Sequence, residues 1–259
     1  MGEPKTLIVT GASRGLGAAV AEVAARRGLN VVMMARSAGD LAAVAERITG
    51  AGGQAVAVPG DVTRAEDVER VVETAVARFG RIDALVNNAG VLEPMARIAA
   101  MDVAAWEYAL AVNVTGPLRL IKAALPYLRQ ARGRVINIST GSSVRPRTGW
   151  GAYSVSKAAL NMLTAVLAEE EPDLVCVAVR PGVVDTEMQA RIREKGRDSM
   201  LPEQYEHFVR LFQTGDLMPP ERPARAIVAL ALHAPRSING EFVSWDDDVV
   251  QGLLRKSND

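Results

Sequence analysis

Short apolar runs alternate along the chain with longer segments in which apolar residues recur at helical spacing. The apolar runs are rich in Val, Ile, Leu and Ala and show no polar alternation, which is typical of strands covered on both faces. Such strands occur mainly in parallel sheets whose connections are helices. We therefore predict an α/β fold with a doubly wound, mainly parallel, seven-stranded sheet. Its expected strands are Thr6–Thr10, Asn30–Ala35, Ala55–Pro59, Ala84–Asn87, Arg134–Ser139, Leu174–Val179 and Glu241–Ser244.

The chain of 259 residues is longer than an average domain, but α/β folds of this length are commonly single. No segment has the composition of a linker, so we expect one domain over residues 1–259. The stretch 189–220 stands out because it is polar, charged and interrupted by prolines and a glycine. It follows the sixth expected strand, and we interpret it as a mobile lid that closes over a substrate.

Composition narrows the range of partners. The 30 basic and 30 acidic residues cancel, which gives no support for binding to nucleic acid or to a membrane surface. The single cysteine, Cys176, lies in an apolar run and excludes a disulfide framework, which suits a reducing compartment. The sequence also shows no apolar stretch of membrane-spanning length and no signal-peptide core before the first strand. We expect a cytoplasmic protein without a membrane or nucleic-acid partner.

A glycine-rich turn directly follows the first expected strand. A helical pattern begins near its Leu16. Glycines let a backbone approach a pyrophosphate closely, and a helix N-terminus presents unpaired N–H groups and a positive dipole end to that anion. Three glycines in a loop are also common in ordinary turns. The position between strand and helix favours a dinucleotide site formed by Gly11, Ser13, Arg14, Gly15, Leu16 and Gly17.

Residues that follow the next strands indicate which cofactor such a site would take. Arg36 follows the second strand, where no Asp or Glu is present to hold a ribose diol, and this favours NADP(H) over NAD(H). Arg14 is expected to join Arg36 at the 2′-phosphate, because guanidinium groups match phosphate geometry. The alternative is two solvated surface arginines. The adenine is expected beside Asp61 and Val62 after the third strand, and the ribose beside Asn88, Ala89 and Gly90 after the fourth.

Tyr153 and Lys157 are spaced to stand one helical turn apart on the same helix face. A phenol with an ordinary pKa of about 10 is a poor acid or base at neutral pH, and a nearby cation favours its phenolate. The pair therefore predicts a proton-transfer device. Taken alone, the same spacing also fits a surface tyrosine beside a solvated lysine.

Together these motifs resemble the short-chain dehydrogenase/reductase family over essentially the whole chain. The resemblance implies a single-domain Rossmann fold that binds a nicotinamide cofactor, here NADP(H), and transfers a hydride without a metal. The family's order and spacing are matched by Thr10–Gly17, Asn87–Gly90, Asn113, Tyr153 with Lys157, and Pro181-Gly182 followed by Thr186.

The resemblance also implies roles for individual residues. Tyr153 would be the acid/base, Lys157 would lower the pKa of that phenol and hold the ribose, and Asn113 would anchor a proton-relay water. The nicotinamide would be flanked by Pro181, Val184 and Thr186.

The sequence departs from the family at one catalytic position. The family usually has a serine thirteen residues before the tyrosine, and in this chain that position is Thr140. A threonine hydroxyl can still hydrogen-bond a substrate carbonyl, although its methyl group restricts χ1 and narrows the pocket. We assign the serine's role to Thr140, with Ser139 and Ser142 as rivals. Of these two, Ser139 is expected to be a buried hydroxyl at the strand end that bonds the backbone.

The C-terminal half is similar to the sepiapterin reductase and benzil reductase branch, whose members reduce one carbonyl of a vicinal diketone with NADPH. Ser244 stands where the pterin-binding acidic residue of sepiapterin reductases is expected, which favours benzil-like ketones. The pocket for the substrate is expected to be lined by Thr140, Trp150, Tyr153, Gly182 and Met188.

The sequence therefore predicts an NADPH-dependent carbonyl reductase acting on a small-molecule ketone. One alternative is an NAD-preferring alcohol or steroid dehydrogenase that runs oxidatively, and another is a non-catalytic NADP-sensing regulator. We also expect a homodimer, because the helices that begin near Met101 and Tyr153 carry apolar faces that pack against a partner in the family.

Overall fold

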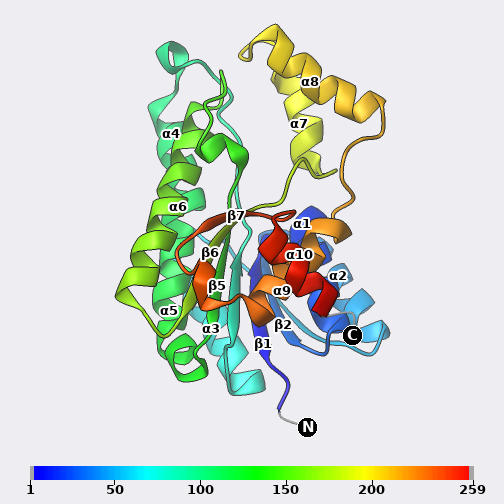
Figure 1. Cartoon of the computed structure of the whole chain (residues 1–259), viewed down its shortest axis with the longest axis vertical. Helices are drawn as coiled ribbons and strands as arrows, with labels where there is room; N and C mark the ends of the chain where they lie inside the picture. Colours follow the sequence, from blue (N-terminus) through cyan, green and yellow to red (C-terminus); the bar gives the residue numbers. More distant parts are fainter. Residues whose placement is uncertain (1–2, 257–259) are drawn as a thin grey trace.

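Seven parallel strands form the central sheet of the computed structural model, which describes residues 3–256 (Figure 1). The spatial order is β3-β2-β1-β4-β5-β6-β7, so the strand order reverses at β1 and the sheet is doubly wound. This confirms the predicted fold class, a single Rossmann-like α/β domain. Three of the expected strands have the observed bounds, three differ by one residue at one end, and the sixth differs by one residue at both ends. The strands are β1 (Thr6–Thr10), β2 (Asn30–Ala35), β3 (Gln54–Pro59), β4 (Ala84–Asn87), β5 (Arg134–Ile138), β6 (Val175–Arg180) and β7 (Phe242–Ser244).

Each face of the sheet is covered by its own hydrophobic core. Successive side chains of a strand point to opposite faces, so Leu7 and Val9 pack into one core and Ile8 into the other. The first core is covered by α1 (Gly15–Arg26), α2 (Ala38–Gly50), α9 (Glu221–His233) and α10 (Asp248–Lys256). The second is covered by α3 (Ala65–Phe79), α5 (Gly116–Ala131) and the C-terminal part of α6 (Gly151–Glu170). The helix α4 (Val103–Leu110) runs into α5 through a π-helical turn, η2 (Ala111–Thr115).

The glycine turn before α1 depends on close backbone packing. Gly11 and Gly15 have φ angles of 65° and 55°, in the left-handed region that favours glycine. A Cβ on Gly17 would lie 2.3 Å from the carbonyl oxygen of Gly11, so a larger residue there would displace the turn. Helix α1 begins at Gly15, one residue before the expected start, and its first turn faces the end of the sheet where β1 and β4 terminate.

Two helices form the segment that the sequence predicts as a lid. Helices α7 (Glu187–Lys195) and α8 (Pro202–Gln213) extend beyond the carboxyl ends of the strands, and the chain then returns to α9 (Figure 1). The sequence did not predict these helices, because their polar residues hide a narrow apolar face. That face packs onto the core of the domain in a third cluster, formed by Leu92, Trp150, Tyr153, Ile192, Met200 and Phe208.

Across residues 3–256, no helix combines the length and the apolar character needed to cross a bilayer.

Candidate active site

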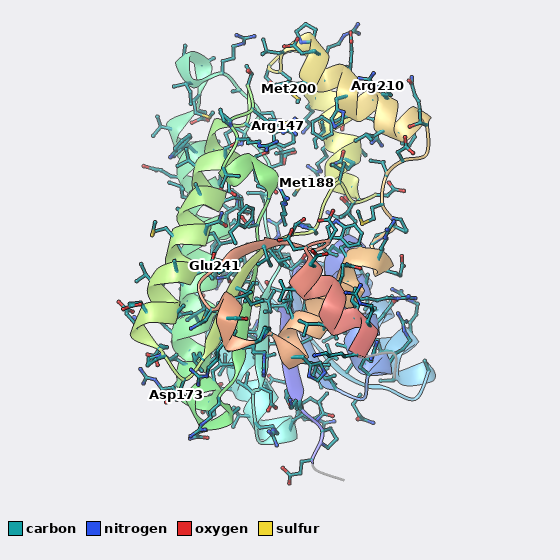
Figure 2. The ribbon with its side chains drawn as sticks, in the orientation of Figure 1. Arg147, Asp173, Met188, Met200, Arg210 and Glu241 are labelled. Carbon is teal, nitrogen blue, oxygen red and sulfur yellow. The ribbon has the colours of Figure 1, made fainter. Side chains whose placement is uncertain are left out.

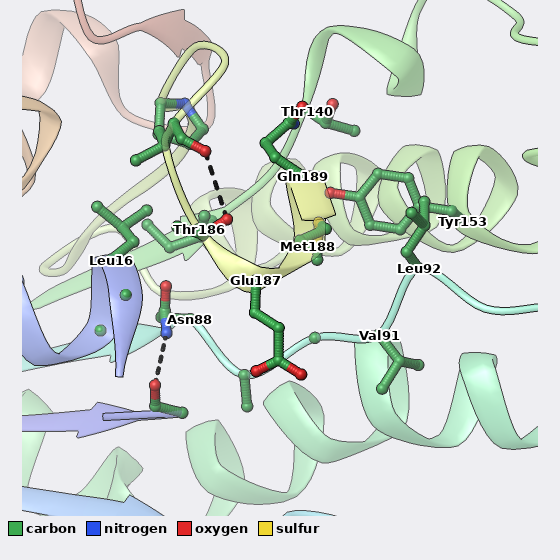
Figure 3. Close-up of a pocket in the computed structure, with 18 of the residues that line it drawn as sticks. Leu16, Asn88, Val91, Leu92, Thr140, Tyr153, Thr186, Glu187, Met188 and Gln189 are labelled. Carbon is green, nitrogen blue, oxygen red and sulfur yellow. Dashed lines mark hydrogen bonds between the residues drawn. The ribbon is translucent and has the colours of Figure 1, made fainter. Parts of the chain in front are cut away.

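A cavity of about 1020 Å³ lies at the carboxyl ends of the strands and extends from the glycine turn to helices α7 and α8 (Figure 3). This is the position at which doubly wound sheets bind ligands, because the strand order reverses there. Every site residue predicted from the sequence lines the cavity except Asn113, and those residues are Gly11, Ser13, Arg14, Gly15, Leu16, Gly17, Arg36, Asp61, Val62, Asn88, Ala89, Gly90, Thr140, Trp150, Tyr153, Lys157, Pro181, Gly182, Val184, Thr186 and Met188.

Helix α6 carries Tyr153 and Lys157 one turn apart, as predicted, and both side chains are buried. The Nζ of Lys157 lies 5.9 Å from the centroid of the Tyr153 ring. This ammonium donates a hydrogen bond of 2.7 Å to the carbonyl oxygen of Ile138 at the end of β5. Burial lowers the pKa of Lys157 to about 8. An ammonium has three donors, so Lys157 keeps further donors for a ligand in the cavity.

Burial raises the pKa of the Tyr153 phenol to about 12, and a hydrogen bond from the hydroxyl of Thr140 partly offsets that rise. The sequence-based expectation was the opposite, a pKa moved down toward neutral by Lys157. In this structure the phenol loses more from leaving water than it gains from its neighbours. Tyr153 is therefore protonated at neutral pH, which is the form that can donate a proton to a substrate oxygen.

Thr140 is positioned by the turn that follows β5. Its backbone is extended, and its Oγ1 accepts a hydrogen bond of 3.3 Å from the N–H of Ser142 at the start of the 3₁₀ helix η3 (Gly141–Ser143). An oxygen that already accepts from the backbone can direct its own proton toward the phenol or a substrate carbonyl. Ser139 is buried as expected, but its hydroxyl donates to Oδ1 of the Asn161 side chain at 2.6 Å and not to the backbone, because Asn161 on α6 lies within reach of the strand end. Ser142 is buried and also lines the cavity, so it stays the rival to Thr140.

Asn113 lies in the π-helical turn between α4 and α5 and does not line the cavity. Its Nδ2 donates to the carbonyl oxygen of Val91 at 2.9 Å and to Oγ of Ser156 at 3.0 Å, while its Oδ1 accepts from the N–H of Val91 at 2.8 Å. The Ser156 hydroxyl in turn donates to the carbonyl oxygen of Tyr153 at 2.9 Å. The side chain thus joins the segment after β4 to helix α6, which carries Tyr153 and Lys157. The proton-relay water at Asn113 stays a prediction.

The glycine turn fits the pyrophosphate of a dinucleotide. Arg14, the residue before α1, forms no side-chain capping bond, and no acidic residue stands in the first turn of this fully described helix. The helix itself therefore places no carboxylate against its first N–H groups, which lie at the cavity. The side chain of Asn88 braces the turn, since its Nδ2 donates to the carbonyl oxygens of Thr10 at 2.9 Å and Gly11 at 3.2 Å (Figure 3). These residues would hold the cofactor's phosphates at the N-terminus of α1.

Both arginines expected at a 2′-phosphate line the cavity, and both already have partners. Arg14 pairs with Glu187, the first residue of α7, at 2.5 Å. Arg36 donates to the hydroxyl of Tyr108 on α4 at 2.9 Å. At the end of β3, Asp61 accepts from the N–H and the hydroxyl of Thr63, both at 2.8 Å. The guanidinium groups of Arg14 and Arg36 stay largely exposed and can reorient toward a phosphate.

Sequence reasoning missed several polar residues that line the cavity, among them Tyr108, Arg147, Glu187 and Gln189. Tyr108 and Arg147 carried no motif that could have indicated them. Glu187 and Gln189 lie directly beside Thr186 and Met188, so their adjacency to predicted residues was an available signal. In Figure 3 the carboxylate of Glu187 points into the cofactor end of the cavity, and Gln189 points toward Thr140.

The sequence matches a known protein family and several curated relatives. A family model described as short chain dehydrogenase matches residues 5–197. An uncharacterised oxidoreductase of Schizosaccharomyces pombe is 39% identical over 243 residues, which cover 93% of this chain and 96% of the relative. A benzil reductase ((S)-benzoin forming) of Saccharomyces cerevisiae is 35% identical over 258 residues, which cover 94% of this chain and 97% of the relative.

A solved structure shows the same similarity in three dimensions. The crystal structure of a short chain dehydrogenase/reductase from Saccharomyces cerevisiae superposes with a TM-score of 0.92 at 37% sequence identity. The match covers 96% of this chain and 99% of the solved one. These matches confirm the resemblance to the short-chain dehydrogenase/reductase family. They also confirm that a benzil reductase is among the relatives.

Proposed function

The chain belongs to the short-chain dehydrogenase family of oxidoreductases, and on that premise we propose that it is an NADPH-dependent carbonyl reductase acting on one carbonyl of a vicinal diketone. The observation that carries the proposal is that the hydroxyl groups of Thr140 and Tyr153 line the same cavity, where Thr140 lowers the pKa of the buried Tyr153 phenol. Both hydroxyls are therefore available to a carbonyl substrate that enters the cavity. A protonated phenol beside a second donor suits the reduction of a ketone.

The reduction follows from the roles of these side chains. When bound, the nicotinamide supplies a hydride to the carbonyl carbon. The carbonyl oxygen accepts a hydrogen bond from Thr140 and takes its proton from Tyr153. Lys157 stabilises the phenolate that remains, because its ammonium lies beside the ring. Solvent then returns a proton to Tyr153.

Preference for NADP(H) is proposed from charge at the adenine end of the cavity. Arg14 and Arg36 line it, and the residues that follow β2 provide no carboxylate at the position that would hold a ribose diol. Arg36 can exchange the Tyr108 hydroxyl for a phosphate, which binds a guanidinium group more strongly, whereas at Arg14 a phosphate competes with the Glu187 carboxylate.

The aromatic residues at the other end of the cavity, away from the adenine, support a flat, apolar substrate. Trp150 meets Tyr153 edge to face with ring centroids 5.8 Å apart and stacks on Phe208 at 5.3 Å. Leu92 and Met188 complete a wall beside the reacting phenol. Aromatic and thioether surfaces of this kind bind aryl groups, and a relative is described as a benzil reductase.

We further propose a cytoplasmic homodimer. Cys176, the only cysteine of the sequence, is buried and free, which suits a reducing compartment. Helix α6 exposes an apolar stripe of Val155, Met162 and Val166 that a second copy would cover.

The decisive assay is turnover of benzil with NADPH and with NADH. The proposal expects consumption of NADPH with formation of benzoin, and a clear preference over NADH. Oxidation of alcohols with NAD⁺ as the faster reaction would instead favour an oxidative dehydrogenase. Tight NADPH binding without turnover of any ketone would favour a regulator.

A further inference from the structure

Arg147 is a half-buried cation at the substrate end of the cavity, in the loop between η3 and α6. Its guanidinium carbon lies 5.5 Å from the ring centroid of Trp150 and 5.1 Å from that of Phe208. Figure 2 shows Arg147 between the upper end of α6 and the lid helices, on the same side as Met188 and Met200. The cation therefore stands over the aromatic wall rather than in bulk solvent.

The positive charge of Arg147 is not neutralised by a neighbouring carboxylate in the described part of the chain. Within residues 3–256, no carboxylate forms an ion pair with Arg147, and burial lowers the pKa of its guanidinium. The uncompensated charge of Arg147 also acts on His207. The pKa of His207 is lowered by burial and by the positive charges of Arg147 and Arg210. Removing a charge from water without a counter-ion destabilises a protein, so a ligand that brings an anion would be favoured here.

The contacts of Arg147 leave its hydrogen-bonding groups available. A guanidinium group over aromatic rings interacts through its π-face, while its N–H donors lie in its plane and match a carboxylate. Two buried polar groups of the cavity wall also have no partner in the part of the chain that the structure describes, the Nε1 of Trp150 and the Oε1 of Gln189. The indole N–H can serve as a second donor to the same anion.

The loop holds Arg147 at a defined distance from the catalytic pair. The N–H of Thr148 donates to Oε1 of Gln204 at 3.1 Å, which fixes the loop to α8. The indole of Trp150 contacts both the guanidinium of Arg147, 5.5 Å from the ring centroid, and the phenol of Tyr153, with centroids 5.8 Å apart. Arg147 and Tyr153 thus share one aromatic neighbour, and no hydrogen bond or ring contact joins the two directly within the described residues, so an anion bound by Arg147 would lie several bonds from a carbonyl at Tyr153.

We propose that the substrate class of this enzyme is an aryl ketone bearing a carboxylate several bonds from the reacting carbonyl, with Arg147 as the carboxylate-binding residue. The inference rests on the proposed carbonyl reductase function. The carboxylate takes no part in the chemistry. The carbonyl carbon gains a hydride from NADPH and the oxygen gains a proton from Tyr153, which yields a hydroxy acid and NADP⁺.

The test compares acids with their methyl esters. Benzoylpropionate and benzoylbutyrate place a carboxylate several bonds from an aryl ketone, whereas benzoylformate places it next to the carbonyl. For the wild-type enzyme with NADPH we expect kcat/KM to favour the two longer acids over their esters by about tenfold or more, the effect of one charge-assisted hydrogen bond. Benzoylformate should show no such preference. In Arg147→Gln the ratio for the longer acids should fall toward one.

Arg145→Gln is the matched control, because Arg145 lies two residues away in the same loop and is exposed. It removes the same charge and should keep the wild-type ratio. Arg147→Lys retains the charge without the planar fork and should give an intermediate ratio. An equal preference for acids and esters in the wild type, or the same loss in Arg145→Gln as in Arg147→Gln, would overturn the assignment.

A binding measurement separates this inference from the reductase function. The enzyme saturated with NADP⁺ has no hydride to deliver and cannot reduce a ketone. Calorimetry on this complex therefore measures the affinity for benzoylpropionate and for its methyl ester without turnover. Tighter binding of the acid that Arg147→Gln abolishes supports the carboxylate site even if no ketone is reduced with NADPH. Turnover of the esters together with equal affinity for acid and ester refutes the site and leaves the reductase function in place.

Discussion

Arg14 Nη1 lies 2.5 Å from Glu187 Oε2, so the glycine turn is tied directly to the first residue of lid helix α7. Glu187 also pairs with Arg191 at 2.9 Å, and Arg191 reaches Glu93 in the segment after β4 at 3.0 Å. These ion pairs cross the cofactor end of the cavity and join three parts of its rim. A cofactor phosphate that binds Arg14 must therefore compete with Glu187.

The first prediction concerns this competition. Glu187→Gln should strengthen NADPH binding by up to about fivefold, because exposed ion pairs contribute at most about 1 kcal/mol and the substitution releases Arg14. Fluorescence titration of the cofactor-free enzyme measures the change in Kd. Glu194→Gln on the exposed side of α7 is the control and should leave Kd unchanged. Weaker binding in Glu187→Gln would show that the carboxylate assists the cofactor.

The second prediction concerns the proton donor. Tyr153→Phe should abolish turnover and leave NADPH binding nearly intact, because only the phenolic proton is lost. Steady-state kinetics and cofactor titration measure the two effects separately. Activity above a tenth of the wild-type value would remove Tyr153 from its role.

The third prediction distinguishes the hydroxyl groups beside Tyr153. Thr140→Ala should lower kcat by about 10²-fold, the effect of removing one oxyanion donor. Ser142→Ala should have a smaller effect, and Ser139→Ala should mainly lower thermal stability, since its hydroxyl bonds Asn161. A larger loss of kcat in Ser142→Ala than in Thr140→Ala would transfer the catalytic role to Ser142.

Sequence reasoning located the cavity but not the contacts across it. The glycine turn, Tyr153 and Lys157 were predictable because each depends on local spacing within a turn or a helix. The contacts Arg14–Glu187 and Arg36–Tyr108 join segments that are far apart in the sequence. No local pattern around Glu187 or Tyr108 indicates that either will contact an arginine. The direction of the Tyr153 pKa was also inaccessible, because it depends on how completely the folded chain removes the phenol from water.

The fourth prediction concerns pH. The kcat/KM for NADPH reports groups of the free enzyme, and the pKa of Lys157 there is about 8. Lys157 carries its charge below this pH and loses it above, so kcat/KM should fall as the pH rises through about 8. Tyr153, with a pKa of about 12, stays protonated over the same range and cannot cause the fall. Lys157→Met should be slow and should lack this limb; a fall that persists in the variant would assign it to another group.

The fifth prediction concerns assembly. Met162 is 65% exposed and Val166 is 44% exposed on the outer face of α6, so Glu at both positions should prevent the proposed dimer. Light scattering coupled to size exclusion measures the mass over a range of concentrations. A surface charge change on α3, Glu73→Lys, serves as the control. A wild-type monomer at every concentration would contradict the proposed homodimer.

The last prediction concerns cofactor choice and depends on how Arg36 is held. Replacing Arg36 by Ala should raise the KM for NADPH at least about tenfold and change that for NADH little, because a charge-assisted contact to the 2′-phosphate contributes about 1.5–3 kcal/mol. Tyr108→Phe is the informative companion, since it keeps Arg36 and removes the hydroxyl that Arg36 contacts at 2.9 Å. If Arg36 must leave Tyr108 to reach the phosphate, this variant should lower the KM for NADPH. The ratio of kcat/KM for NADPH to that for NADH decides which cofactor the enzyme uses. A wild type that prefers NADH, or a ratio that Arg36→Ala does not change, would replace the NADPH assignment with an NAD-dependent one.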